Sequence, residues 1–177
     1  MLIVINPGHC PGEDSGAVNQ NTGLQEADVV LNIGNLLAGY LENVDYETKI
    51  VQLNDLNEIC DVANGCGADL FISLHCNGAE STQANGTETW YYDQSEEGES
   101  LAYCIQEQII NSLGTTDRGI KSAVPHKNGL YVLTNTNMTG VLVETAFITN
   151  DSDEQLLADR QDDFARAIAR GITDYIK

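Results

Sequence analysis

The distribution of apolar residues predicts strands and helices that alternate along the chain. Short apolar runs typical of strands occur at 2–6, 46–53, 68–75, 86–92, 130–134 and 140–145. Apolar residues with helical spacing lie in between, from Glu26 to about 42, over 55–65, from Ser95 to near 114, from Ser152 onward, and in a last stripe with Phe164 and Ile168. This alternation predicts an α/β fold in which 1–177 is a single domain, with a mixed, mostly parallel central sheet of about six strands flanked by helices.

Two long segments have no periodic apolar pattern. Residues 7–23 are rich in Gly, Asn and Asp, and residues 114–129 contain no run typical of a helix or strand. Loops of this length within a compact domain are more often functional than idle. We therefore expect the second loop, which contains several basic residues, to contribute to a functional site.

Four residues with metal and acid–base chemistry lie at or near the ends of the apolar runs. His9 follows the first run, His75 ends the third, Glu144 follows Val-Leu-Val, and Glu26 begins the helix after the first loop. Active sites of α/β sheets collect beyond the carboxyl ends of the strands. Two imidazoles and a carboxylate are a ligand set of catalytic zinc, and a second carboxylate can carry the proton.

Each of these residues also has a purely structural interpretation. The two histidines could be ordinary loop and strand-end residues, and Glu26 could serve only the helix dipole. An ionised carboxylate is costly to bury unpaired within an apolar stretch. Glu144 therefore indicates either a nearby cation or a buried ion pair with Arg118 or Lys121.

Charge and composition exclude several classes of function. The 27 acidic and 8 basic residues give a formal net charge of −19, which argues against nucleic-acid binding and against attraction to an anionic surface. No apolar stretch approaches the roughly 20 residues that cross a bilayer, so we expect no membrane insertion. The five cysteines form no CxxC pair and are typical of a reduced protein. We expect Cys10 and Cys76, which each follow a histidine, to be packing residues rather than metal ligands or a disulfide.

Two other kinds of site fit the sequence poorly. The glycine-rich segment 7–16 follows a strand, but it lacks the GK[ST] ending of a phosphate-binding loop. A thiol hydrolase would pair Cys10 or Cys76 with a histidine. Each cysteine directly follows a histidine, and neighbouring side chains on a strand point to opposite faces, so such a pair is disfavoured.

The motifs together resemble the zinc-dependent N-acetylmuramoyl-L-alanine amidases of bacterial wall-remodelling enzymes and phage endolysins. The resemblance covers nearly the whole chain, through INPGHCPGEDSGAV, the helix opened by Glu26, VANGCGADLFISLHCN, DRGIK and VLVETAFITN. It implies that His9, Glu26 and His75 bind one Zn²⁺ per chain and that Glu144 is the catalytic glutamate. It also implies that Asn77 shapes the site.

The chain departs from the family pattern near the first histidine. Asn6 stands where an Asp commonly precedes Pro-Gly-His, and Cys10 stands where a Gly is common. If that Asp orients the histidine, Asn6 could still accept a hydrogen bond through its amide oxygen, but without charge, and metal affinity would fall. In the loop predicted over 114–129, Arg118 and Lys121 are candidates for binding the carboxylates of the stem peptide of peptidoglycan.

The resemblance implies an enzyme that hydrolyses the amide bond between N-acetylmuramic acid and L-alanine of peptidoglycan. We expect it to act as a monomer. A zinc peptidase acting on a related peptide bond is an alternative, and so is an inactive wall-binding or regulatory module. Met1 runs directly into the first strand, so no signal peptide is expected. The sequence is then that of an endolysin released from the cytoplasm at lysis, or of an autolysin domain excised from a secreted protein.

Overall fold

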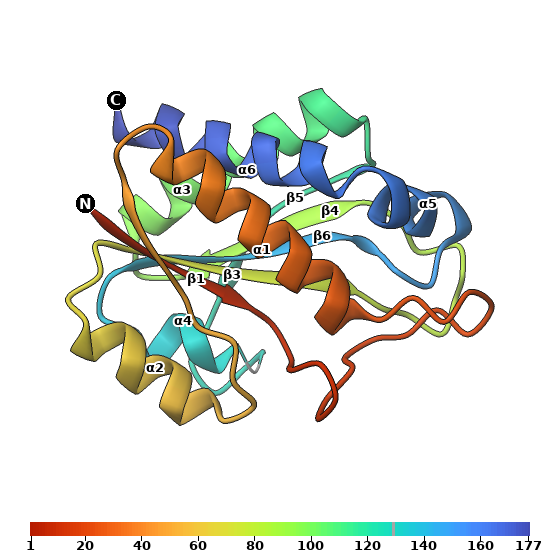
Figure 1. Cartoon of the computed structure of the whole chain (residues 1–177), viewed down its shortest axis with the longest axis horizontal. Coiled ribbons are helices and arrows are strands. Elements are labelled where there is room, and N and C mark those ends of the chain that lie inside the picture. Colours follow the sequence, from red (N-terminus) through yellow and green to blue (C-terminus); the bar gives the residue numbers. More distant parts are fainter. Residues whose placement is uncertain (129) are drawn as a thin grey trace.

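One six-stranded sheet forms the centre of the molecule in the computed structural model, which describes residues 1–128 and 130–177 (Figure 1). Its strands are β1 (Leu2–Pro7), β2 (Glu47–Ile50), β3 (Leu70–Asn77), β4 (Thr87–Tyr92), β5 (Asp117–Ala123) and β6 (Thr139–Phe147). Their order is β2-β1-β3-β6-β4-β5, and only the β4–β6 pair is antiparallel. The predicted α/β fold with a mixed, mostly parallel sheet is confirmed.

Helices cover both faces of the sheet (Figure 1). One face packs on α1 (Glu26–Glu42), α3 (Glu96–Leu113) and α6 (Gln161–Ile176), and the other packs on α2 (Leu56–Gly65) and α4 (Tyr131–Asn135), while α5 (Asp151–Asp159) connects β6 to α6. The larger apolar core lies under α1, α3 and α6, and a smaller one lies under α2 and α4. None of the helices in the described part of the chain is both long and apolar enough to cross a membrane.

Side-chain caps set several helix boundaries. The Asp55 carboxylate accepts hydrogen bonds from the first backbone N–H groups of α2, and the Ser95 hydroxyl does the same for α3. For α5 the predicted start at Ser152 is wrong. The side chain of Asn150 accepts a hydrogen bond from the backbone N–H of Asp153. Asn150 is therefore the N-cap, and the helix begins at Asp151.

Two sequence predictions between 114 and 135 are wrong. Residues 117–123 of the segment predicted as a loop form β5, and the predicted last residue of that loop, Gly129, lies outside the described residues. Strand β5 is polar because it is an edge strand paired only with β4, so it has no alternating apolar pattern. The run 130–134 is α4 and not a strand, and it buries Val132 and Leu133. A short apolar run does not distinguish a buried strand from a short helix.

Strands β1, β3 and β6 end at the same edge of the sheet because they are adjacent and parallel. The backbone N–H of Gly8 still bonds to the carbonyl of Leu74, so the chain leaves β1 beside β3. On β3 and β6, His75 and Glu144 lie directly opposite each other. The residues that the sequence indicated as a site therefore lie together at the carboxyl ends of these strands.

Candidate metal centre

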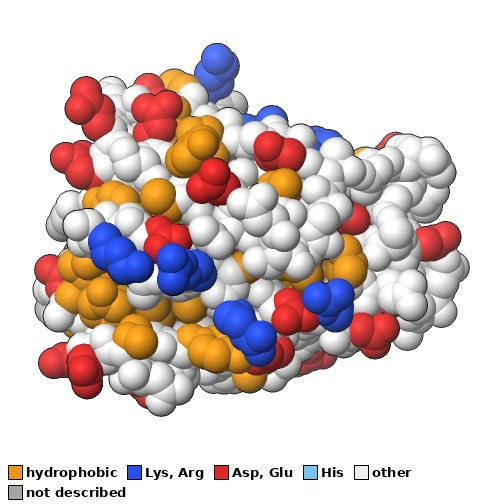
Figure 2. All heavy atoms as spheres, turned by 90° about the horizontal axis from the view of Figure 1, so that it is seen from above, with side chains coloured by type: hydrophobic (Ala, Val, Ile, Leu, Met, Phe, Trp, Pro, Cys, Tyr) orange, Lys and Arg blue, Asp and Glu red, His pale blue; other side chains and the backbone are white. Residues whose placement is uncertain are grey.

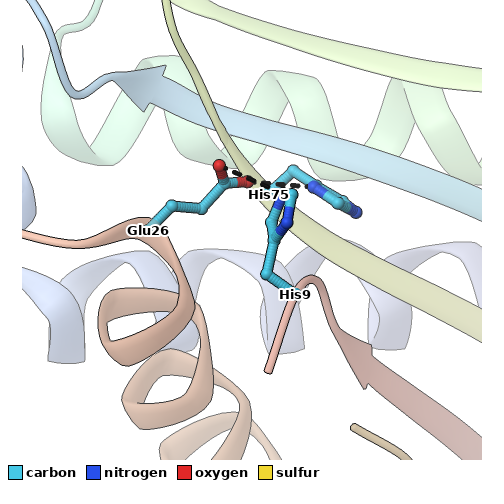
Figure 3. A group of neighbouring side chains, drawn as sticks. All are labelled: His9, Glu26 and His75. Carbon is cyan, nitrogen blue, oxygen red and sulfur yellow. Dashed lines mark hydrogen bonds and ion pairs between the residues drawn. The ribbon is translucent and has the colours of Figure 1, made fainter. Parts of the chain in front are cut away.

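His9, Glu26 and His75 present one ligand atom each within 4.8 Å of one another. The Nε2 atom of His9 lies 3.2 Å from Oε2 of Glu26, and Nδ1 of His75 lies 2.9 Å from Oε1. Figure 3 shows the two imidazoles converging on the carboxylate from the loop after β1 and from β3, while Glu26 stands at the first turn of α1. Three different elements thus bring a His₂Glu donor set together.

The carboxylate of Glu26 is held in place by backbone groups. The residue is only 3% exposed, and its two oxygens accept hydrogen bonds from the N–H groups of Ala17 and Cys76, at 2.8 and 3.0 Å. Burial raises the pKa of Glu26, but hydrogen bonds from His75 and His9 outweigh it and hold the pKa below its usual range. The group is therefore an ionised carboxylate with a fixed orientation, as a metal ligand requires.

The His9 ring is oriented by Asp14. Its Nδ1 atom lies 2.7 Å from Oδ2 of Asp14, whose other oxygen accepts from the backbone N–H of Gly16. His9 itself has a φ of 60°, a conformation that non-glycine residues seldom adopt. With Nδ1 engaged, Nε2 is the atom that faces Glu26. The hydrogen bond with Glu26, together with Asp14, raises the pKa of His9 to about 9 in the absence of a metal.

Two glycines allow the ligands to approach the backbone closely. A Cβ atom at Gly8 would lie 2.2 to 2.6 Å from ring atoms of His75. A Cβ atom at Gly16, which has a φ of +64°, would lie 2.5 Å from Oε2 of Glu26 and 2.6 Å from the His9 ring. Larger residues at either position would displace the ligands, so these glycines are part of the site.

Glu144 is the neighbour of this donor set on β6. Its Oε2 atom is buried and has no hydrogen-bond partner among the described residues. Burial is the main cause that raises the pKa of Glu144, to about 7. A buried carboxylate oxygen without a donor is costly unless a cation or a bound molecule satisfies it. The arrangement can therefore hold or release a proton beside an open metal site.

The glutamate that pairs with Arg118 and Lys121 is the buried Glu88 and not Glu144. Glu88 lies on β4 directly opposite Glu144, and its Oε2 atom is 2.7 Å from Nε of Arg118 and 3.9 Å from Nζ of Lys121. Its other oxygen accepts from the indole N–H of Trp90. The structural interpretation of Glu144 as a partner of Arg118 or Lys121 is therefore wrong.

Two hollows flank the ligands. The one between α2 and α4 has a volume of about 340 Å³ and begins at His9 and His75. The other is an open cleft of about 460 Å³ beyond the strand ends, which Glu26, Glu144 and Asn77 also line. A substrate can consequently extend from the ligands in two directions.

Sequence comparison decides the family. The family model described as N-acetylmuramoyl-L-alanine amidase matches residues 3–174. The chain belongs to this amidase family. N-acetylmuramoyl-L-alanine amidase LytC of Bacillus subtilis is 39% identical over 99% of the chain, which spans only 35% of that relative's length.

Solved structures of amidases have the same fold as this chain. The N-acetylmuramoyl-L-alanine amidase AmiC2 of Nostoc punctiforme aligns with a TM-score of 0.90 at 35% identity, covering 99% of this chain and 97% of that one. The catalytic domain of CwlV from Bacillus (Paenibacillus) polymyxa aligns with a TM-score of 0.88 at 29% identity, with coverages of 99% and 97%. The resemblance inferred from the motifs is thereby confirmed.

The candidate site differs from expectation at Asn6. Its amide oxygen accepts from the Ser73 hydroxyl at 2.8 Å, and its amide nitrogen donates to the carbonyl of Val51 at 2.8 Å. Asn6 therefore joins β1, β3 and the segment after β2, and it does not orient His9. That hydrogen bond is made by Asp14, so the loss of an acid before Pro-Gly-His leaves the histidine supported.

Two carboxylates at or near the candidate site, Asp14 and Glu88, were not predicted from the sequence. Asp14 lies in a glycine-rich loop and has no pattern that distinguishes it from a turn residue. Glu88 could have been found, because an acid within the apolar and aromatic run 86–92 raises the same question as Glu144. The five cysteines are free thiols, and the buried Sγ of Cys76 lies 3.4 Å from the Thr145 hydroxyl, not against a histidine.

Proposed function

We propose that residues 1–177 form a zinc-dependent catalytic domain that hydrolyses the amide bond between N-acetylmuramic acid and L-alanine in peptidoglycan. One observation carries the proposal. An open His9–Glu26–His75 donor set lies beside Glu144, whose buried Oε2 atom has no partner among the described residues. Family membership supports the same bond as the target.

The donor set fits zinc. Two imidazoles and one carboxylate are the protein ligands of many catalytic zinc sites, which keep a fourth position open. Metal-ligating histidines commonly share their second nitrogen with a carboxylate, as His9 does with Asp14. We propose one zinc per chain, held by Nε2 of His9, Nδ1 of His75 and the carboxylate of Glu26.

A zinc ion held there supplies a Lewis acid that polarises a carbonyl and activates water. Glu144 takes a proton from the attacking water while the water oxygen bonds to the lactyl carbonyl carbon. As the carbon–nitrogen bond breaks, Glu144 passes that proton to the nitrogen of L-alanine and is again a carboxylate. Its raised pKa suits a group that must both accept and release a proton near neutral pH.

We propose that Arg118 and Lys121 bind the carboxylates of the stem peptide. Both contact Glu88, which lies on β4 opposite Glu144 of β6. Arg118 and Lys121 themselves lie on β5, two strands from Glu144, and neighbouring strands are roughly 4.8 Å apart. Each side chain is about one third exposed, at 36% and 35%. Asn77, in the open cleft, is proposed to contact the substrate near the scissile bond.

We further propose that the domain acts on the wall as a monomer, either as an endolysin released at lysis or as an autolysin domain of a secreted parent. A zinc peptidase and an inactive wall-binding module are the alternative functions. The intact donor set and the unpaired Glu144 oxygen favour an active enzyme over the latter.

Product analysis tests the assignment. The zinc-loaded protein is incubated with purified peptidoglycan, and the released fragments are weighed by mass spectrometry. We expect free stem peptides with an unblocked L-alanine amine and glycan strands that carry lactyl carboxylates. Fragments cut between two amino acids would identify a peptidase instead, and the absence of any cleavage would contradict an enzymatic role.

Replacing Asp14 with Asn should weaken zinc binding. Asn keeps the shape of the side chain but removes the charge that supports His9, and loss of such an outer partner typically lowers metal affinity 10–100-fold. Competition with a chromophoric chelator measures that affinity directly. Asp61→Asn, an exposed acid on α2, is the matched control. Equal affinities for the two variants would show that Asp14 does not support the metal site.

A further inference from the structure

The hollow between α2 and α4 is a built extension of the catalytic site. It begins at His9 and His75 and reaches the end of β1 and the segment after β2, with α2, α4 and Leu142 of β6 as its other walls, and Glu144 is not among its described lining residues. Its volume of about 340 Å³ lies within the range of small-ligand sites, roughly 300–1,000 Å³. Beyond the two histidines, its lining includes Asp14, Asn54, Leu56 and Tyr131.

The chemistry of proton transfer fixes which half of the substrate enters this hollow. The departing nitrogen must lie near Glu144 to receive its proton, and Glu144 lies on β6, between β3 and β4. The peptide half therefore leaves the ligands toward β4 and β5. The acyl half is bonded to the other side of the same carbonyl carbon, so it points back across β3 toward β1, where the hollow opens.

The distribution of charge agrees with this orientation. The stem peptide is acidic, and the hollow contains Asp14 but no Lys or Arg among its described lining residues. Arg118 and Lys121 lie in the opposite direction, on β5. On the face in Figure 2, which is the upper side of Figure 1, Lys and Arg side chains lie among Asp and Glu side chains. The cations near and on α6 are paired there with neighbouring acids, as Arg160 is with Asp163.

The lining of the hollow suits an uncharged sugar. Tyr131 is 39% exposed, and its hydroxyl donates to the side-chain oxygen of Asn57 at 2.7 Å, which holds the ring between α4 and α2. Leu56 is 47% exposed on the same hollow, and Asn54 adds a polar amide. A fixed aromatic ring with apolar neighbours and an amide can pack on the C–H face of a pyranose and bond to its hydroxyl or acetamido groups.

We propose that this hollow is the glycan subsite, and that it binds the muramoyl residue while the stem peptide extends past Glu144 toward Arg118 and Lys121. The proposal rests on the proposed amidase function and deepens it, because it gives the substrate one direction across the sheet. Tyr131 and Leu56 then determine how much the sugar contributes to binding.

Two substrates with the same stem peptide test the placement. One carries the disaccharide on the lactyl group, and the other is a sugar-free N-lactoyl peptide with the same scissile amide. We expect Tyr131→Ala to lower kcat/KM on the disaccharide substrate about tenfold, mainly through KM, and to leave the sugar-free substrate unaffected. Lys121→Gln should lower kcat/KM equally on both, because it contacts only the peptide. Tyr103→Ala, at a 58% exposed tyrosine on α3, is the matched control and should change neither.

The outcomes separate the placement from the function on which it rests. Equal losses on both substrates with Tyr131→Ala, or no loss on either, would overturn the glycan subsite while the amidase assignment stands. If the native protein cleaves neither substrate, the proposed function itself fails. Leu56→Ser, at an exposed position on the same hollow, repeats the comparison in case Tyr131→Ala does not fold, and the same selective loss is expected.

Discussion

The Glu144→Gln variant is expected to retain its zinc and to lose almost all release of stem peptides. Gln has the volume of Glu but cannot take a proton from water and return it to the departing nitrogen. Loss of a general acid–base group typically lowers the rate by about 10²–10⁴-fold. Zinc content by atomic emission and peptide release from purified walls measure the two properties separately.

The control for this experiment is Glu107→Gln, which changes an exposed acid on α3, on the other face of the sheet. It should leave both zinc content and activity at the native level. Native activity in Glu144→Gln would remove Glu144 from the mechanism. Loss of zinc in that variant would instead make Glu144 a ligand and not the proton carrier.

Stability should move in the direction opposite to activity. The folded-state pKa of Glu144 is raised to about 7, above its unfolded value, so the metal-free folded protein holds a proton there that the unfolded chain releases at lower pH. The ionised carboxylate then costs stability as the pH rises from about 4.5 to 7, and the cost is complete above 7. Metal-free Glu144→Gln should therefore melt above metal-free native protein at pH 8, and the difference should vanish at pH 4.

The second large effect is expected for Glu26→Ala. The variant lacks the carboxylate on which both histidines converge, so zinc content should fall from about one per chain to near zero, with loss of activity. It also leaves the buried N–H of Cys76 without its acceptor, which costs roughly 1–3 kcal/mol of stability. Emission spectroscopy, wall digestion and thermal melting measure the three effects.

Asp28→Ala is the matched control, because Asp28 is an exposed acid in the same first turn of α1. It should keep zinc and activity. Native protein treated with a chelator should lose activity and regain it when zinc is added back. Full activity of Glu26→Ala, or of the chelated native protein, would show that catalysis does not depend on this metal site.

The elements around the site were predictable because their apolar patterns are strong. Strands β1, β3 and β6 are nearly continuous apolar runs buried on both faces, and two of them deliver His75 and Glu144 to one edge. The amphipathic pattern of α1 predicted that Glu26 is at the start of a helix. These residues could be linked from sequence because each ends or begins a well-defined element.

What the sequence did not predict depends on tertiary contacts. Strand β5 has few apolar residues, and α4 is a single short turn of helix stabilised by packing on α2 and the sheet. The role of Asp14 depends on a left-handed residue and a tight loop that bring it back to His9. The position of Glu88 opposite Glu144 depends on the pairing of β4 with β6. No local pattern encodes such pairings, because they are set by the packing of distant segments.

The polarity that concealed β5 also protects the molecule. An edge strand exposes unpaired backbone groups that can join the sheet of another chain. Strand β5 begins with Asp117 and Arg118 and is interrupted by a register shift opposite β4, while the other edge, β2, has only four residues, including Glu47 and Lys49. Charge and shortness at both edges disfavour sheet-to-sheet aggregation, so a concentrated solution of this protein should resist fibril formation.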